Sequence, residues 1–139
     1  MKNLALAICA AAIYAAPLPA AEPQPKEWTV MLFMNGNAGL EPLDDINEME
    51  EAGPGKGLNI VAEVGMPGWT KDGKPWAGSR RFLIAKDPGK SKTVVSPVIY
   101  EEQGTDMGDW RRVGRFVEWT KARYPARRYA LVFWGHGAG

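Results

Sequence analysis

The chain has 139 residues, of which 17 are basic and 16 acidic, and its formal net charge is +1. This length allows one domain with a modest hydrophobic core. Nucleic-acid binding is not expected, because it requires a basic surplus on one surface and the charges here nearly cancel. The clustered arginines are interpreted as part of a solvated helix face; they occupy positions 111, 112, 115, 123, 127 and 128.

Residues 1–21 are predicted to be a signal peptide. A lysine gives a short positive region, an uncharged apolar run follows at 4–16, and small residues provide a cleavage site after Ala20 or Ala21. The run is shorter than the roughly 20 apolar residues that cross a bilayer. No membrane span is therefore expected, and export is favoured over a retained N-terminal anchor. We expect a secreted or periplasmic protein in which residues 22–27 form a linker.

The only cysteine, Cys9, lies inside this segment. Lipidation of Cys9 is disfavoured because Ile8, immediately before it, is bulkier than such sites usually accept. Removal of the signal peptide would leave neither a disulfide nor a thiol nucleophile in this chain.

The next segments predict a strand, a helix and a second strand. Residues 28–34 are uncharged and favour β-structure, which indicates a buried central strand. Residues 35–39 form a predicted turn and helix cap. Residues 40–52 repeat apolar side chains every three positions and place six carboxylates on the other faces, which predicts a helix with a solvated acidic side. With the strand predicted at 58–64, this is a right-handed βαβ unit.

A hairpin and an edge strand are predicted next. Residues 71–74 are a turn signal between Trp69 and Trp76, and a strand follows at 79–85. The two tryptophans either line a groove or pack on each other, and the sequence leaves both readings open. Residues 93–100 are predicted to be extended at a sheet edge, because they contain a proline.

Asp109 is the predicted cap of a second helix that runs to about Tyr124. Its apolar residues recur on one side and predict a stripe that packs on the core. They are Trp110, Val113, Phe116, Val117, Thr120 and Tyr124.

The chain ends in an apolar run and a histidine between glycines. Residues 129–134 carry no charge, which predicts a strand buried on both faces. His136, the only histidine, follows that strand, and ligands of open α/β sheets bind outside the carboxyl ends of strands. Its imidazole can transfer a proton near neutral pH, and the N–H of Gly137 can face a developing oxyanion. Residues 35–37 end the first strand at the same edge. A purely structural histidine is the alternative.

Several short blocks occur in an order and spacing that are specific only when taken together. The strongest is Tyr124-Pro125-Ala126 followed by Trp134-Gly135-His136-Gly137-Ala138-Gly139; the others include Trp28-Thr29-Val30, Met34-Asn35-Gly36, Arg80-Arg81 and Met107-Gly108-Asp109. In these blocks the chain resembles the clostripain-like cysteine peptidases, relatives of the caspases and gingipains. The resemblance covers residues 28–139.

The resemblance implies a caspase-like three-layer α/β sandwich with a mostly parallel sheet. It also implies a Cys–His dyad that cleaves peptide bonds, often after Arg or Lys, in peptide or protein substrates. In that comparison His136 matches the catalytic histidine, and the N–H of Gly137 matches half of the oxyanion hole. Calcium is suggested by some relatives only. No metal or other cofactor is expected in this chain, because no ligand cluster has convincing spacing.

One departure from the family is informative. The family's nucleophile follows the histidine, at the end of the next strand, and this chain stops at Gly139. We therefore expect residues 28–139 to be the N-terminal part of the peptidase domain, truncated after the histidine loop, with the sheet incomplete on its C-terminal side. The expected partner is a Cys-bearing segment or chain of the same enzyme, without which this chain is inactive.

Two alternatives use the same residues differently. The first is a catalytically inactive secreted fragment or binding module of the same fold, in which His136 is structural. The second, less favoured, is an α/β-hydrolase esterase fragment whose oxyanion loop is formed by residues 136–139. That enzyme class requires a Gly-x-Ser-x-Gly motif, which this sequence lacks.

Overall fold

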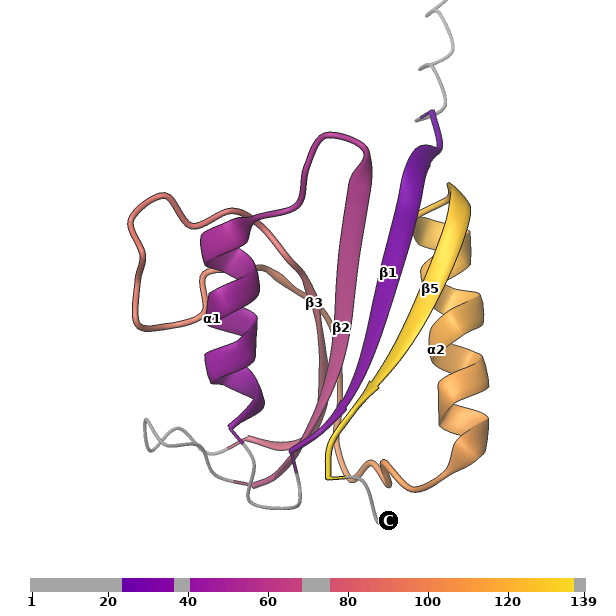
Figure 1. Ribbon diagram of the computed structural model, residues 1–139. Helices are drawn as coiled ribbons and strands as arrows, with labels where there is room; N and C mark the ends of the chain where they lie inside the picture. Colours follow the sequence, from indigo (N-terminus) through magenta and orange to yellow (C-terminus); the bar gives the residue numbers. More distant parts are fainter. Residues whose placement is uncertain (1–23, 37–40, 69–75, 137–139) are drawn as a thin grey trace, which may run out of the picture.

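The computed structural model describes residues 24–36, 41–68 and 76–136. These residues form a five-stranded sheet with one helix on each face (Figure 1). The elements, in chain order, are β1 (Lys26–Asn35), α1 (Pro42–Ala52), β2 (Leu58–Pro67), β3 (Ala77–Leu83), β4 (Val98–Glu102), α2 (Trp110–Arg123) and β5 (Ala126–Trp134). Neither helix of this described part is long and apolar enough to cross a membrane.

The strands lie in the order β4-β3-β2-β1-β5. β1 is parallel to both of its neighbours, β2 and β5, as the predicted βαβ unit requires. β3 is antiparallel to β2, with Pro67 opposite Ala77, which confirms the predicted strand after the turn and places it within the sheet. Trp69 and the predicted turn at 71–74 lie outside the described residues. β4 pairs only with β3 and is an edge strand of the described sheet, as the proline at 97 indicated.

Alternate side chains of β1 enter two separate cores. Leu32 and Met34 face α1, whose Ile46 is fully buried. Phe33 faces α2, whose Phe116 is fully buried and lies 6.2 Å from it between ring centroids. This alternation follows from the period of two in a strand. It confirms the expected α/β sandwich, in which each face of the sheet is covered by a helix.

One carboxylate of α1 differs from the prediction. Glu50 is 1% exposed, so the expectation that all the carboxylates of this helix are solvated is wrong for it. Glu50 lies one helical turn after Ile46 and therefore shares the buried side of the helix. Its carboxylate accepts hydrogen bonds from the backbone N–H groups of Val95, at 3.1 Å, and Ser96, at 2.7 Å. This contact fixes the segment before β4 against α1.

α2 begins as predicted, at a cap formed by Asp109. The side chain of Asp109 accepts a hydrogen bond from the Arg111 N–H at 3.0 Å, and this bond lowers the pKa of the Asp109 carboxyl. The predicted core stripe is confirmed for Phe116 and Thr120, which are fully buried, and wrong for Trp110, which is 74% exposed. Trp110 is the first helical residue and lies beside the end of the sheet, where the core no longer covers it.

The prediction that β5 is buried on both faces is wrong. β5 is an edge strand of the described sheet and pairs only with β1. Leu131, Val132 and Phe133 are consequently exposed, Phe133 by 67%. An uncharged apolar run predicts a strand covered by neighbouring elements. In the described sheet, however, no strand lies on the outer side of β5.

A buried ionic cluster joins α2 to the sheet. Glu63 of β2 is fully buried, and its two carboxylate oxygens contact different arginines. Arg81 Nε of β3 lies 2.8 Å from Oε2, and Arg112 Nη2 of α2 lies 2.5 Å from Oε1. Arg112 also donates to Ser79 and, at 3.1 Å, to Glu102. The buried carboxylate of Glu63 therefore compensates Arg81 and shares the compensation of Arg112 with Glu102.

Glu102, the most exposed residue of this cluster, leads us to expect a loss of stability in acid. Partial burial raises the pKa of Glu102, but the Arg112 guanidinium and the Tyr100 hydroxyl bonded to it outweigh burial, so the pKa lies below its ordinary value. The resulting stabilisation is complete above the unfolded pKa of about 4.3 and is lost as the pH falls through the folded value. We expect urea midpoints measured from pH 6 to pH 3 to fall less steeply for Glu102→Gln than for the parent chain. Parallel curves would contradict this assignment.

Candidate active site

His136 lies at the end of the sheet where β1 and β5 finish. It follows β5 by two residues, and the register pairs Met34 of β1 with Trp134 of β5. The next residues of the two strands are adjacent, since a Cβ built on Gly135 would lie 3.9 Å from the Cβ of Asn35. Topology therefore places the end of β1 beside the histidine, as expected for two parallel neighbours.

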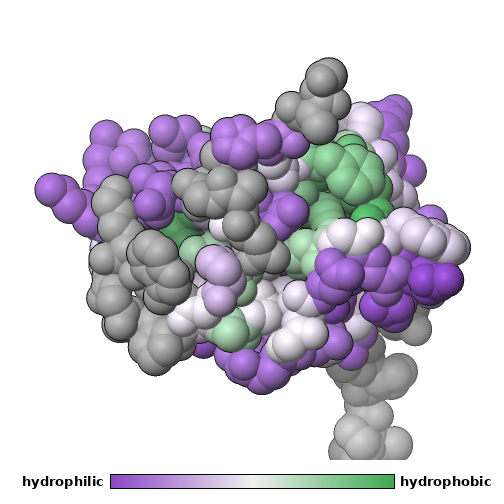
Figure 2. All heavy atoms as spheres, turned by 90° about the horizontal axis from the view of Figure 1, so that it is seen from below, coloured by the Kyte–Doolittle hydropathy of each residue, from purple (hydrophilic) through white to green (hydrophobic). Residues whose placement is uncertain are grey.

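A cavity of about 630 Å³ opens at this end of the sheet, and His136 lines it. Its volume falls within the range of small-molecule and peptide side-chain sites. Figure 2 looks onto this end and shows apolar surface gathered beside hydrophilic residues. The described lining residues come from the ends of β1 and β5 and from the start of α2; they are Phe33, Asn35, Met107, Gly108, Trp110, Val113, Phe133, Trp134, Gly135 and His136.

His136 is exposed, so a substrate can reach its imidazole. It is the only residue with an acid–base side chain among the described residues that line this cavity. The remaining walls are apolar apart from Asn35, which suits a group that accepts and returns a proton away from competing acids and bases. The described cavity thus supplies a base and offers no nucleophile of its own.

Gly137, the other predicted site residue, lies outside the described residues. Two aromatic residues at this cavity were assigned to the buried core from sequence and are instead exposed. They are Trp110 and Phe133, the latter 6.1 Å from Phe33 between ring centroids. The position of Trp110 directly after the cap Asp109 was the available signal, because a first-turn residue extends beyond the covered part of a helix.

No group of three or more His, Cys, Asp or Glu side chains in the described part of the chain could hold a metal ion. The residues that line the His136 cavity include no carboxylate, so they do not fit the oxygen ligands that calcium requires.

Comparisons with known proteins agree with this arrangement. A cysteine protease from B. fragilis superposes with a TM-score of 0.61 at 24% identity, over 81% of this chain and 91% of that one. A clostripain from Bacteroides thetaiotaomicron in complex with a peptide inhibitor superposes with a TM-score of 0.58 at 16% identity, over 83% of this chain and 94% of that one. A secreted C11 cysteine protease from Bacteroides thetaiotaomicron gives 0.58 at 21%, over 81% of this chain and 30% of that one. A search of curated proteins by sequence finds no match.

These likenesses confirm the expected caspase-like α/β fold. This chain spans nearly the full length of the first two structures and less than a third of the third. The sequence profile of the clostripain family matches residues 33–139, which include the end of β1 and every described element after it. The chain therefore belongs to the clostripain family of cysteine peptidases.

Proposed function

We propose that this chain is the histidine-bearing part of an exported cysteine endopeptidase that hydrolyses peptide bonds after Arg or Lys. The observation that carries the proposal is the single exposed histidine lining a cavity at the carboxyl ends of β1 and β5. The clostripain from Bacteroides thetaiotaomicron was solved with the peptide inhibitor BTN-VLTK-AOMK, whose peptide portion ends in lysine, and this supports a basic residue before the cleaved bond.

In this proposal His136 moves the proton. Its imidazole takes the proton of a cysteine thiol, the thiolate attacks the carbonyl carbon, and the imidazolium then protonates the leaving amine. The N–H of Gly137 supplies one of the donors that stabilise the oxyanion. Both residues belong to this chain, while the thiol belongs to a segment outside it.

The outer edge of β5 indicates where that segment binds. β5 pairs only with β1 in the described sheet, and its apolar residues Leu131, Val132 and Phe133 are exposed. A strand added parallel to β5 would lie about 4.8 Å from it and end at the same rim as His136. A cysteine at the end of that strand would then be next to the imidazole. The added strand would also remove an unpaired edge, which is a liability for an isolated domain.

The organisation of the whole chain completes the proposal. Residues 1–21 act as a signal peptide and 22–27 as a linker, and residues 28–139 form the N-terminal part of the peptidase domain. A relative described as secreted supports export. The esterase alternative is not favoured, because the family that matches is that of clostripain.

The test is to complete the enzyme. The chain is co-expressed with the segment encoded downstream of it, and cleavage is measured on matched peptides with Arg, Lys, Ala or Asp before the scissile bond. We expect cleavage after Arg or Lys that a thiol-alkylating reagent stops. Cleavage that resists alkylation, or no cleavage of any of the peptides, would refute the proposal. Repeating the assay with a chelator tests the calcium requirement suggested by some relatives.

A further inference from the structure

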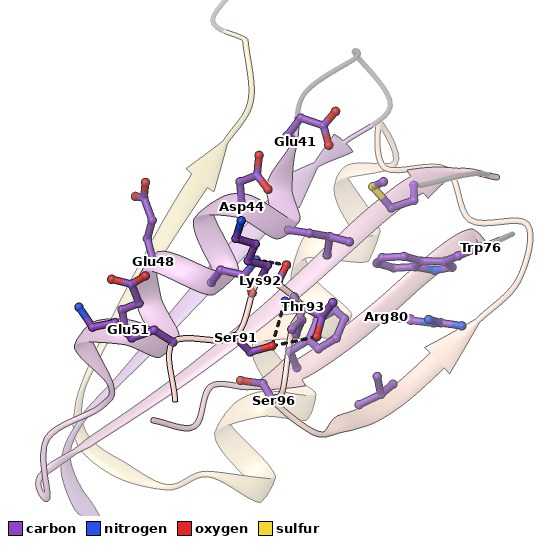
Figure 3. A pocket seen from close by; sticks show the side chains of 17 residues that line it. Glu41, Asp44, Glu48, Glu51, Trp76, Arg80, Ser91, Lys92, Thr93 and Ser96 are labelled. Atoms are coloured by element: carbon purple, nitrogen blue, oxygen red, sulfur yellow. Dashed lines mark hydrogen bonds between the residues drawn. The ribbon is translucent and has the colours of Figure 1, made fainter. Parts of the chain in front are cut away.

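A second cavity, of about 740 Å³, lies on the α1 face of the sheet (Figure 3). Its walls are α1, the β3 side with Trp76 and Arg80, and the segment 90–98. Its described lining residues include none of those around His136. The reaction proposed above does not use it, so its polar groups need a separate explanation.

Three buried polar atoms of residues lining this cavity have no hydrogen-bond partner in the part of the chain that the structure describes. They are Nε1 of Trp76, Nε of Arg80 and Oδ1 of Asn47. Trp76 is only 4% exposed, so its N–H carries a desolvation cost that no described residue offsets. All three atoms are shielded from bulk water. A ligand in the cavity would therefore have to displace the side chains that cover these atoms in order to pair with them.

The two unpaired donors belong to one stacked pair. Arg80 Cζ lies 4.7 Å from the centroid of the Trp76 ring, and Figure 3 shows both side chains on the same side of the cavity. Arg80 uses Nη2 for Glu101, at 3.2 Å, which leaves its Nε–H for another acceptor. Two neighbouring N–H donors, one of them on a cation, match a carboxylate.

The wall formed by α1, opposite these donors, carries hydrogen-bond acceptors and negative charge. The unpaired Oδ1 of Asn47 is a free acceptor there, and four carboxylates lie along α1 and at its N-cap, as Figure 3 shows. Lys90 and Lys92 of the neighbouring segment offset part of that charge. A simple anion would meet these carboxylates, and a simple cation would leave the Trp76 and Arg80 donors unpaired. The four carboxylates are those of Glu41, Asp44, Glu48 and Glu51.

We propose that this cavity binds a short peptide that has a free C-terminal carboxylate and a basic side chain. The carboxylate accepts from Trp76 Nε1 and Arg80 Nε, and the basic side chain donates to Asn47 and the carboxylates of α1. Cleavage after a basic residue releases peptides of this kind, so the cavity would take a product of the proposed reaction. The binding itself does not require that reaction.

Calorimetric titration of the full chain tests the proposal without any turnover. The probes are acetyl-Ala-Ala-Arg as the free acid, the same peptide as its amide, and acetyl-Ala-Ala-Ala as the free acid. We expect the first to bind, and the other two to bind about tenfold more weakly because each lacks one of the two charges. Equal binding of acid and amide, or no binding of the first probe up to about 10 mM, would overturn the proposal.

Variants locate the binding. Trp76→Phe keeps an aromatic ring and removes the N–H donor, and Arg80→Gln removes the cation. Each variant should bind the free-acid Arg peptide about tenfold more weakly. His136→Ala should leave this binding unchanged, because His136 lines the other cavity. Loss of binding in His136→Ala with full binding in Trp76→Phe would contradict the site. If Trp76→Phe does not fold, the double variant Glu41→Gln/Glu48→Gln decides, since it should abolish the preference for Arg over Ala.

Discussion

For the proposed completed enzyme, we expect replacement of His136 by alanine to lower kcat/KM for peptide cleavage by about a thousandfold or more. A thiol without a neighbouring base is mostly protonated at neutral pH, and the leaving amine then lacks its proton donor. His136 is the only residue with an acid–base side chain among the described residues lining its cavity, so no neighbour there can replace it. The measurement is the initial rate of cleavage of an Arg-containing peptide by parent and variant.

Two controls separate catalysis from folding. His136 is exposed and follows the last strand, so the variant should unfold at the same urea concentration as the parent. Glu118→Gln, an exposed change on α2 that lines neither cavity, should keep the parental rate. Cleavage at more than about a tenth of the parental rate in His136→Ala would remove His136 from the mechanism.

The largest loss of stability is expected for Glu63→Ala. This change leaves the buried Arg81 and Arg112 guanidinium groups without their shared carboxylate, whose oxygens lie 2.8 and 2.5 Å from them. Breaking a buried ion pair on one side typically costs about 3–5 kcal/mol in the free energy of unfolding. Arg81 also packs over Tyr100 and Trp119, at 4.3 and 4.6 Å from their ring centroids, so it cannot simply turn out to solvent.

Urea unfolding at pH 7 measures this effect against a matched surface pair. Glu101→Gln breaks the more exposed contact with Arg80 and should cost less than about 1 kcal/mol. A triple change of Glu63, Arg81 and Arg112 to apolar residues of similar volume should recover much of the loss, because it removes the uncompensated charges. If Glu63→Ala costs no more than Glu101→Gln, the cluster is not a stabilising element.

The sequence predicted the elements of this fold better than their burial. An uncharged run located β1, a mostly apolar run located β2, and Asp109 marked the start of α2. Burial was wrong for several residues because it depends on neighbours distant in the sequence. Glu50 is covered by the segment that returns at Val95 and Ser96, Trp110 lies beyond the core, and Phe133 lies on an edge strand.

The candidate site followed from topology more than from any local motif. His136 could be placed at the rim because strands that run parallel end on the same side of a sheet, and the structure places it there beside a cavity. The cavity wall from α2 was not predictable, since it depends on how the helix crosses the sheet. For the second cavity, the sequence left open that Trp76 lines a groove, as it does. The other walls were not predictable, because Asn47 and Arg80 come beside Trp76 only through β2–β3 pairing and the packing of α1.

The buried carboxylate of Glu50 has a consequence for that second cavity. It holds the backbone at Val95 and Ser96, so two of the walls, the helix and the returning segment, are joined to each other independently of the strands. The same segment is also bonded to the β3 side, because the Ala85 N–H donates to Ser96 Oγ at 3.0 Å and the Leu83 N–H donates to the Pro97 carbonyl at 3.2 Å. The returning segment therefore braces α1 against the β3 side, and the width of the cavity between them is set by the fold without a ligand.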